Sequence, residues 1–170
     1  MATLGPDDGT LSVRTGRSGA AARAGHDLVL EVTSWEATFD ESAIVLTADA
    51  RSLKVREGTG GVKALDDDDK ANIEQTIDDD VLKGGPIEFR STAVAADRER
   101  LSVRGDLRIG SRSNPIAFEL LHSGGRLAGS ATLKQTDWGI KPYSALFGTL
   151  KVANEVTVSI DVNTGRLRDG

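Results

Sequence analysis

The side chain best suited to acid–base chemistry is His26, which is followed directly by Asp27. Because an imidazole titrates near neutral pH, His26 could act as a general base or hydrogen-bond the polar head of a ligand. A histidine at the start of a strand more commonly makes a structural hydrogen bond. The second histidine, His122, lies beside Ser123 at an expected hairpin edge, where side chains are usually exposed. Of the two histidines, His26 is therefore the candidate acid or base.

Two runs of aspartate, Asp66 to Asp69 and Asp78 to Asp80, could supply carboxylates to a metal ion. Clustered carboxylates suit Mg²⁺ bridging to a diphosphate. Consecutive acids, however, point around a helix instead of converging on one ion, and the Asp-Asp-x-x-Asp motif of prenyl-diphosphate enzymes is absent. We therefore expect no metal site. We interpret Asp66 to Asp69 as a solvated cap at the positive end of a helix dipole.

A third group of candidate residues is aromatic. Trp138, Tyr143 and Phe147 lie in the connection Trp138 to Gly148, which contains the only tyrosine of the chain. They could line a ligand entrance, with the Tyr143 hydroxyl as a polar contact. Equally, this connection could fold down as a hydrophobic plug. Both interpretations stay open at this point.

The composition narrows the classes of function. The 170 residues include no cysteine, which excludes disulfide scaffolds, thiol nucleophiles and thiolate metal sites. This fits a reducing compartment, and we expect a cytoplasmic protein. The net charge is −5 and the basic residues are scattered, so we expect no nucleic-acid partner. We also expect no cofactor.

The chain has the length of a single domain, and we expect one domain over residues 1–170. No stretch approaches the roughly 20 apolar residues that span a bilayer. Residues 1–8 lack the basic start and the apolar run of a signal peptide. We therefore expect neither integral membrane association nor signal-directed export. A homodimer is compatible with the sequence.

The elements that must position these candidates are strands. From Arg100 to Ile109 every apolar side chain is odd-numbered and every polar side chain is even-numbered, which separates a buried face from a wet one. Short polar connections at residues 97–99 and 123–125 predict hairpins. Other alternating runs occur at Leu11 to Thr15, Leu28 to Val32, Trp35 to Phe39, Ile44 to Ala50, Ile87 to Ala93, Ile116 to Leu120, Leu127 to Thr136 and Val156 to Val162. The pattern predicts a mainly β protein with antiparallel neighbours.

One segment, Leu65 to Leu82, predicts a single helix of roughly four turns. Its apolar residues Ile73, Ile77 and Val81 are four apart and share a face. Lys83-Gly84-Gly85-Pro86 then ends it. Such a helix could cover one end of a barrel. We interpret the preceding residues 53–61 as a polar loop.

Four stretches carry a more specific signal than alternation does. They are Arg17-Ser18 through Gly25-His26 with Thr38-Phe39 downstream, the helix followed by Pro86-Ile87-Glu88-Phe89-Arg90-Ser91-Thr92, then Gly105-Asp106-Leu107-Arg108-Ile109 with Asn114-Pro115-Ile116, and finally Lys134-Gln135-Thr136-Asp137-Trp138-Gly139-Ile140. Together they resemble the YceI-like family, which includes polyisoprenoid-binding proteins. The resemblance covers nearly the whole chain, and the Pro86 to Thr92 string is its most specific part.

The resemblance implies a lipocalin-like, extended antiparallel β-barrel of about eight strands with one inserted α-helix. It also implies that the interior binds or carries an elongated apolar ligand, a polyisoprenoid or another lipid. Burial of apolar surface could hold such a ligand with few hydrogen bonds. The residues expected to contact it are His26, Leu28, Leu30, Phe89, Leu101, Val103, Leu107, Phe118, Trp138, Tyr143 and Phe147.

Two other functions stay open. The same cavity could belong to an enzyme acting on a small amphiphilic substrate, with His26, Tyr143 or a nearby carboxylate as acid or base. A convergent cluster of titratable groups would favour that hypothesis. A self-associating structural or stress protein would instead need an exposed apolar patch larger than a few hundred Å².

Overall fold

The computed structural model describes residues 2–18, 27–40, 42–59, 66–142, 144–145 and 150–165, most of which lie in strands. The strands are β1 (Ala2–Leu4), β2 (Gly9–Ser18), β3 (Asp27–Val32), β4 (Trp35–Asp40), β5 (Ala43–Ala48), β6 (Leu53–Thr59), β7 (Ile87–Asp97), β8 (Arg100–Ile109), β9 (Arg112–Ser123), β10 (Arg126–Lys134), β11 (Ser144–Ala145) and β12 (Leu150–Asn163). The helical segments are η2 (Ala50–Ser52), α1 (Asp67–Thr76), η3 (Ile77–Leu82) and η4 (Gln135–Trp138).

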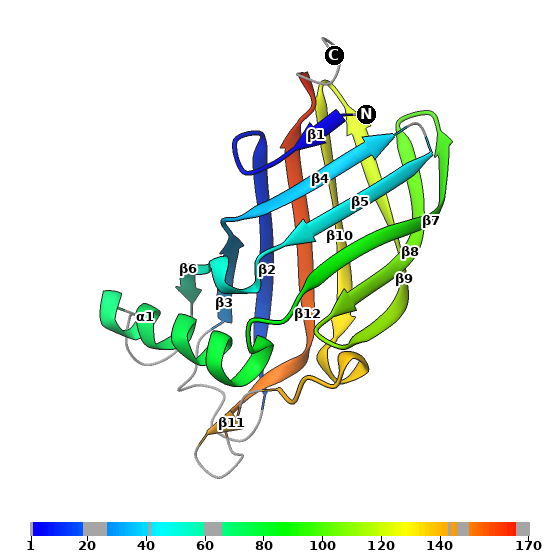
Figure 1. The fold of residues 1–170 in the computed structure, drawn as a ribbon. Helices are drawn as coiled ribbons and strands as arrows, with labels where there is room; N and C mark the ends of the chain where they lie inside the picture. Colours follow the sequence, from blue (N-terminus) through cyan, green and yellow to red (C-terminus); the bar gives the residue numbers. More distant parts are fainter. Residues whose placement is uncertain are drawn as a thin grey trace.

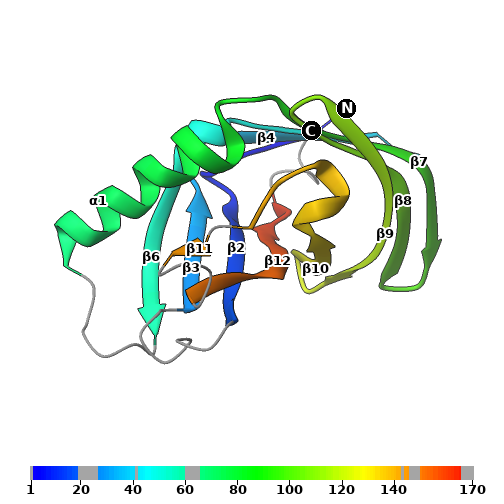
Figure 2. The same cartoon turned by 90° about the horizontal axis from the view of Figure 1, so that it is seen from below.

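All the strands belong to one antiparallel sheet that curls around a common interior (Figures 1 and 2). Eleven of them follow in the order β1-β4-β5-β7-β8-β9-β10-β12-β2-β3-β6, and the short β11 pairs with β12. This confirms the predicted antiparallel barrel. The strand count exceeds the predicted eight because β1–β2, β3–β4 and β5–β6 are successive segments separated by kinks, and each pair occupies the place of one barrel strand.

The kinks between β3 and β4 and between β5 and β6 are joined by hydrogen bonds. The amide of Thr33 donates to the carbonyl of Ser52 at 3.0 Å, and the amide of Ser34 donates to the Ser52 hydroxyl at 3.0 Å. In the other direction, the amide of Asp49 donates to the carbonyl of Ser34 at 3.0 Å. We call this contact the Ser52 corner. It replaces the regular ladder where both strands bend, so buried amides keep partners.

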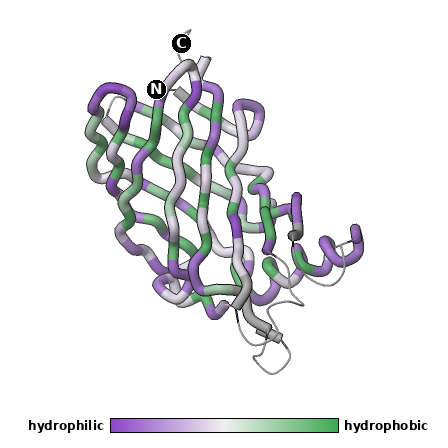
Figure 3. Tube along the Cα trace, turned by 180° about the vertical axis from the view of Figure 1, so that it is seen from behind, coloured by the Kyte–Doolittle hydropathy of each residue, from purple (hydrophilic) through white to green (hydrophobic). Residues whose placement is uncertain are grey.

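Alternation along the strands separates the two faces of the sheet, as Figure 3 shows by the change of hydropathy from residue to residue. In β8 the odd-numbered side chains are buried or partly buried and the even-numbered ones are exposed, as predicted. Segment 53–61, which we interpreted as a loop, is a strand as far as Thr59, so that interpretation was wrong. Leu53 and Val55 face the core, and pairing with β3 stabilises this short alternating run.

The inserted helix begins where the sequence predicted. The Asp66 side chain accepts from the amide of Asp69, and the Asp69 side chain caps the amide of Asp66 in return. The chain stays helical to Leu82, but it widens to a π-helix from Ile77 onward, which the sequence did not predict. Lys83 then adopts a left-handed conformation, with φ of 54°, and ends the helix.

Gly105, in the middle of β8, lies under the ring of Phe89. A Cβ atom at this position would lie 2.3 Å from the carbonyl oxygen of Arg90 and 2.6 Å from Cζ of Phe89. The Phe89 ring also contacts Phe118, with 5.4 Å between the ring centroids. Only a glycine therefore allows the Phe89 ring to lie flat over β8.

We expect Gly105→Ala to lower the free energy of unfolding by about 1–3 kcal/mol, because the backbone and the Phe89 ring must both shift. Urea unfolding followed by circular dichroism measures this. Gly16→Ala is the matched control, since a Cβ there meets only the Ala153 Cβ at 3.7 Å. Equal effects of the two substitutions would contradict the packing argument.

Candidate ligand-binding cavity

The barrel encloses a cavity of about 570 Å³. Its wall is formed by inward side chains of β2 to β10 and β12, together with residues of α1, η3 and η4. This volume lies within the range of about 300–1,000 Å³ that is typical of small-molecule sites. Figure 2 looks along the barrel from the end where α1 and η4 lie.

The cavity exists because many inward side chains at this end are small. They include Gly16, Ala48 and Ala131. Leu4, Val103 and Val162 are at most 1% exposed and are not on the cavity wall, and Leu4 and Val162 belong to β1 and β12, which reach the end of the barrel nearest the two termini (Figure 1). The interior is thus divided into a packed end and a hollow end.

The wall of the cavity is almost entirely apolar, and most of its few polar groups already have partners. Thr76 donates its hydroxyl to the carbonyl of Asn72 at 2.9 Å. Gln135 donates its side-chain amide to the carbonyl of Ala153 at 3.0 Å, and Asp49 accepts from the amide of Arg51 at 2.9 Å. Such a wall selects a ligand by shape and apolar surface, with few directional bonds.

The helix forms one side of the cavity. Asn72, Ile73, Thr76, Ile77, Val81 and Leu82 all lie on the wall. The apolar face predicted from the spacing of Ile73, Ile77 and Val81 therefore faces the interior of the barrel. No residue of α1 or η3 is fully buried, because the outer face of the helix lies in solvent.

Trp138 closes part of the hollow end. It is 6% exposed, and its indole N–H donates to the carbonyl of Leu107 at 2.8 Å. The neighbouring residues of η4 are bound to the strands on both sides: Asn114 donates to the carbonyl of Asp137 at 2.6 Å, and Thr136 bonds twice to Asn154. Trp138 is thus part of the wall, while Tyr143 and Phe147 lie outside the described residues, so the choice between a ligand entrance and a plug stays a prediction.

The structure brings six of the predicted contact residues together. Leu28, Leu30, Phe89, Leu107, Phe118 and Trp138 lie on the cavity wall. Leu101 and Val103 share their face of the sheet but belong to the core instead of the wall. His26, Tyr143 and Phe147 lie outside the described residues. The part that each residue plays in binding stays a prediction.

Several wall residues were missed by sequence reasoning. They lie on the kinked strands, as do Phe39 and Leu46, and on β12, where Val156, Val158 and Ile160 alternate inward. The alternation of β12 was visible in the sequence and could have identified its three residues. The wall residues of the helix were not predicted as contacts because nothing local indicates which strands a helix will cover.

Comparison with known proteins agrees with this fold. The family model of the YceI-like domain matches residues 12–164. The chain belongs to the YceI-like family. No curated protein matches its sequence significantly. The YceI-like family is known for binding hydrophobic ligands, and the apolar cavity fits a binding role.

Two crystal structures illustrate the shared YceI-like fold. BcnA of Burkholderia cenocepacia superposes with a TM-score of 0.59 at 17% identity, over 89% of this chain and 94% of that chain. The YceI protein of Campylobacter jejuni superposes with a TM-score of 0.55 at 15% identity, over 76% of this chain and 79% of that chain.

Other features of the described residues bear on a metal site, on a membrane-spanning helix and on self-association. No three His, Asp or Glu side chains in the described part of the chain form a group able to hold a metal ion. None of the helical segments that the structure describes has the length and apolar content needed to cross a membrane. Among the same residues, Leu121 is the one large hydrophobic side chain that is exposed, at 53%.

The two tryptophans allow the bond to Leu107 to be tested. Both are 6% exposed, but the indole N–H of Trp35 has no hydrogen-bond partner within the described residues. We expect Trp138→Phe to lower the free energy of unfolding by about 1–2 kcal/mol more than Trp35→Phe, because it removes the buried hydrogen bond from the indole to the carbonyl of Leu107. Urea unfolding of both variants measures the difference. A larger loss for Trp35→Phe would contradict this assignment.

Proposed function

We propose that this protein binds or carries an elongated apolar ligand, a polyisoprenoid or another lipid, inside the hollow end of the barrel. The observation that carries the proposal is the 570 Å³ cavity with its almost entirely apolar wall. Burying an apolar chain contributes about 25 cal/mol per Å² removed from water. A chain that fills the cavity therefore needs few polar contacts to be held.

Membership of the YceI-like family supports the same class of ligand, since the family includes polyisoprenoid-binding proteins. The enzyme hypothesis has less support. The wall carries one carboxylate within the described residues, Asp49, and it caps η2. His26 and Tyr143, the acid and base candidates, lie outside the described residues.

The direct test is to extract purified protein with organic solvent and to identify the extracted molecule by mass spectrometry. We expect an apolar chain in stoichiometric amount. The extracted protein should then bind retinol, a fluorescent isoprenoid alcohol, in a titration. A stripped protein that binds no apolar chain would contradict the proposal.

Filling the cavity tests its location. We expect Ala131→Phe to weaken retinol binding by about tenfold or more, because the new ring occupies space on the wall that the ligand needs. Ala117→Phe is the matched control, since Ala117 lies on the exposed face of β9. Fluorescence titration compares the dissociation constants. Equal values for Ala131→Phe and the unmodified protein would place the ligand elsewhere.

A further inference from the structure

The barrel has a side opening in its backbone ladder that the helix covers. Among the described strands, β6 pairs only with β3, and β7 pairs with β5 and β8. No ladder therefore joins β6 to β7. In Figures 1 and 2 the helix lies beside β6 and runs toward the start of β7. Behind it lies the cavity, because the helix supplies that side of the wall.

One carboxylate takes the place of the missing strand. The amide of Val55, on the free edge of β6, donates to Oε2 of Glu74 at 2.9 Å. Oε1 of Glu74 forms an ion pair with Nζ of Lys54 at 3.7 Å. An edge strand normally needs cover to avoid unwanted pairing, and Glu74 covers this one while binding the helix to it.

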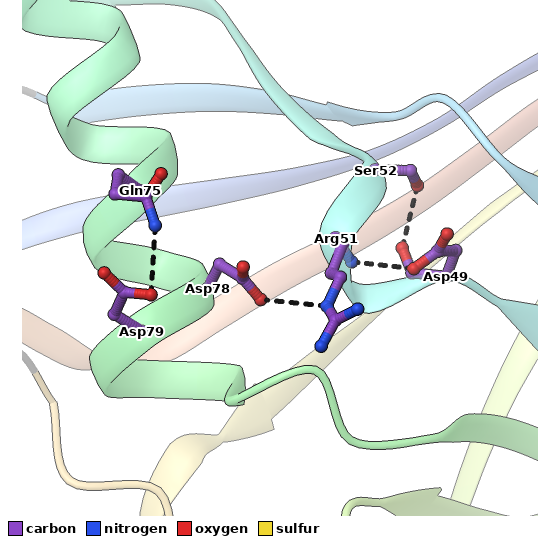
Figure 4. A network of polar contacts seen from close by, with 6 residues as sticks. All are labelled: Asp49, Arg51, Ser52, Gln75, Asp78 and Asp79. Carbon is purple, nitrogen blue, oxygen red and sulfur yellow. Dashed lines mark hydrogen bonds and ion pairs between the residues drawn. The ribbon is translucent and has the colours of Figure 1, made fainter.

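A second contact binds the other half of the helix to the Ser52 corner. Nε of Arg51 lies 3.6 Å from Oδ1 of Asp78, with Arg51 71% exposed (Figure 4). Asp79 instead accepts from Gln75 within the helix at 3.0 Å. Exposed ion pairs such as this one contribute little to stability because water screens them. Apart from its apolar face and the bond from Val55 to Glu74, the helix is thus held by few and weak contacts.

The other described cover of the hollow end is held more firmly. Trp138 is buried and bonded to β8, and the rest of η4 is hydrogen-bonded to β9 and β12. The helix by contrast ends in two consecutive left-handed residues, Lys83 with φ of 54° and Gly84 with φ of 65°. Directly after them, the carbonyl of Pro86 accepts from the amide of Gly110 at 2.8 Å and fixes the chain. The amide of Gly85 also donates to the carbonyl of Leu82 at 3.1 Å, so Lys83 and Gly84 form a helix C-cap, and a swing of the helix would pivot between this cap and Pro86.

We propose that the apolar ligand enters and leaves the cavity sideways, between β6 and β7, when α1 and η3 move away from the barrel as a gate that Glu74 holds closed. The inference rests on the proposed binding function. It assigns Glu74 a role in the rate of ligand exchange. Opening of the gate changes how often the ligand can pass, but it does not change the wall that the bound ligand contacts.

The first test compares Glu74→Ala with Glu119→Ala. Glu119 forms an ion pair of similar length, 3.8 Å from Arg100, between β8 and β9, and it is more exposed than Glu74 and far from the helix. We expect Glu74→Ala to raise the association and dissociation rates of retinol by the same factor, on the order of tenfold, with the dissociation constant unchanged. Stopped-flow fluorescence measures both rates. Glu119→Ala should leave them as in the unmodified protein.

The second test locks the gate. Because the chain has no cysteine, Lys54→Cys with Glu74→Cys can be joined by a bismaleimide linker at these two positions alone. We expect linking to slow both rates by about tenfold or more relative to the same protein before linking. Arg100→Cys with Glu119→Cys, joined by the same linker, is the control and should exchange retinol at an unchanged rate.

The outcomes separate the two proposals. Unchanged rates in the linked helix, with retinol still bound, would overturn the gate and direct the ligand through the end of the barrel, while leaving the binding function intact. A dissociation constant that changes as much as the rates would make Glu74 part of the wall and would also overturn the gate. Failure of the unmodified protein to bind retinol or any extracted lipid would overturn both proposals.

Discussion

Backbone amides at the breaks of the sheet lose their ladder partners and need other acceptors, because an unpaired amide away from water is costly. At the Ser52 corner, the carbonyl and hydroxyl of Ser52 accept from the amides of Thr33 and Ser34. At the open edge of β6, the carboxylate of Glu74 accepts from the amide of Val55. The bend at the Ser52 corner and the position of the helix therefore both supply acceptors to amides that have lost their ladder partners.

The size of the inward side chains decides where the barrel is solid. Around Leu4, Val103 and Val162 the side chains fill the space, as protein interiors usually do. Around Gly16, Ala48 and Ala131, which line the cavity, they are too short to meet across the barrel, and the space stays open. Aromatic residues make up only 4% of the chain, so few large rings are present to fill the gap.

Local patterns predicted local structure well. The strand Arg100–Ile109 and the helix cap at Asp66 depend on neighbours a few residues away, and both were confirmed. The strand β6 was misread as a loop because Leu53 and Val55 are its only core-facing apolar residues, and its pairing partner β3 lies more than twenty residues earlier. The local sequence does not indicate a partner for Asp78, because that partner, Arg51, comes from the Ser52 corner.

The sequence by itself determined the class of fold, the place of the helix and the family, because alternation, caps and the Pro86 to Thr92 string are all read along the chain. Only the tertiary structure decided which inward residues line a cavity and which belong to a packed core. Leu107 and Val103 follow the same alternation on the same strand, yet only Leu107 reaches the cavity. The physical reason is that the empty volume beside an inward side chain depends on the size of the side chains across the barrel. Those side chains come from strands far apart in the sequence.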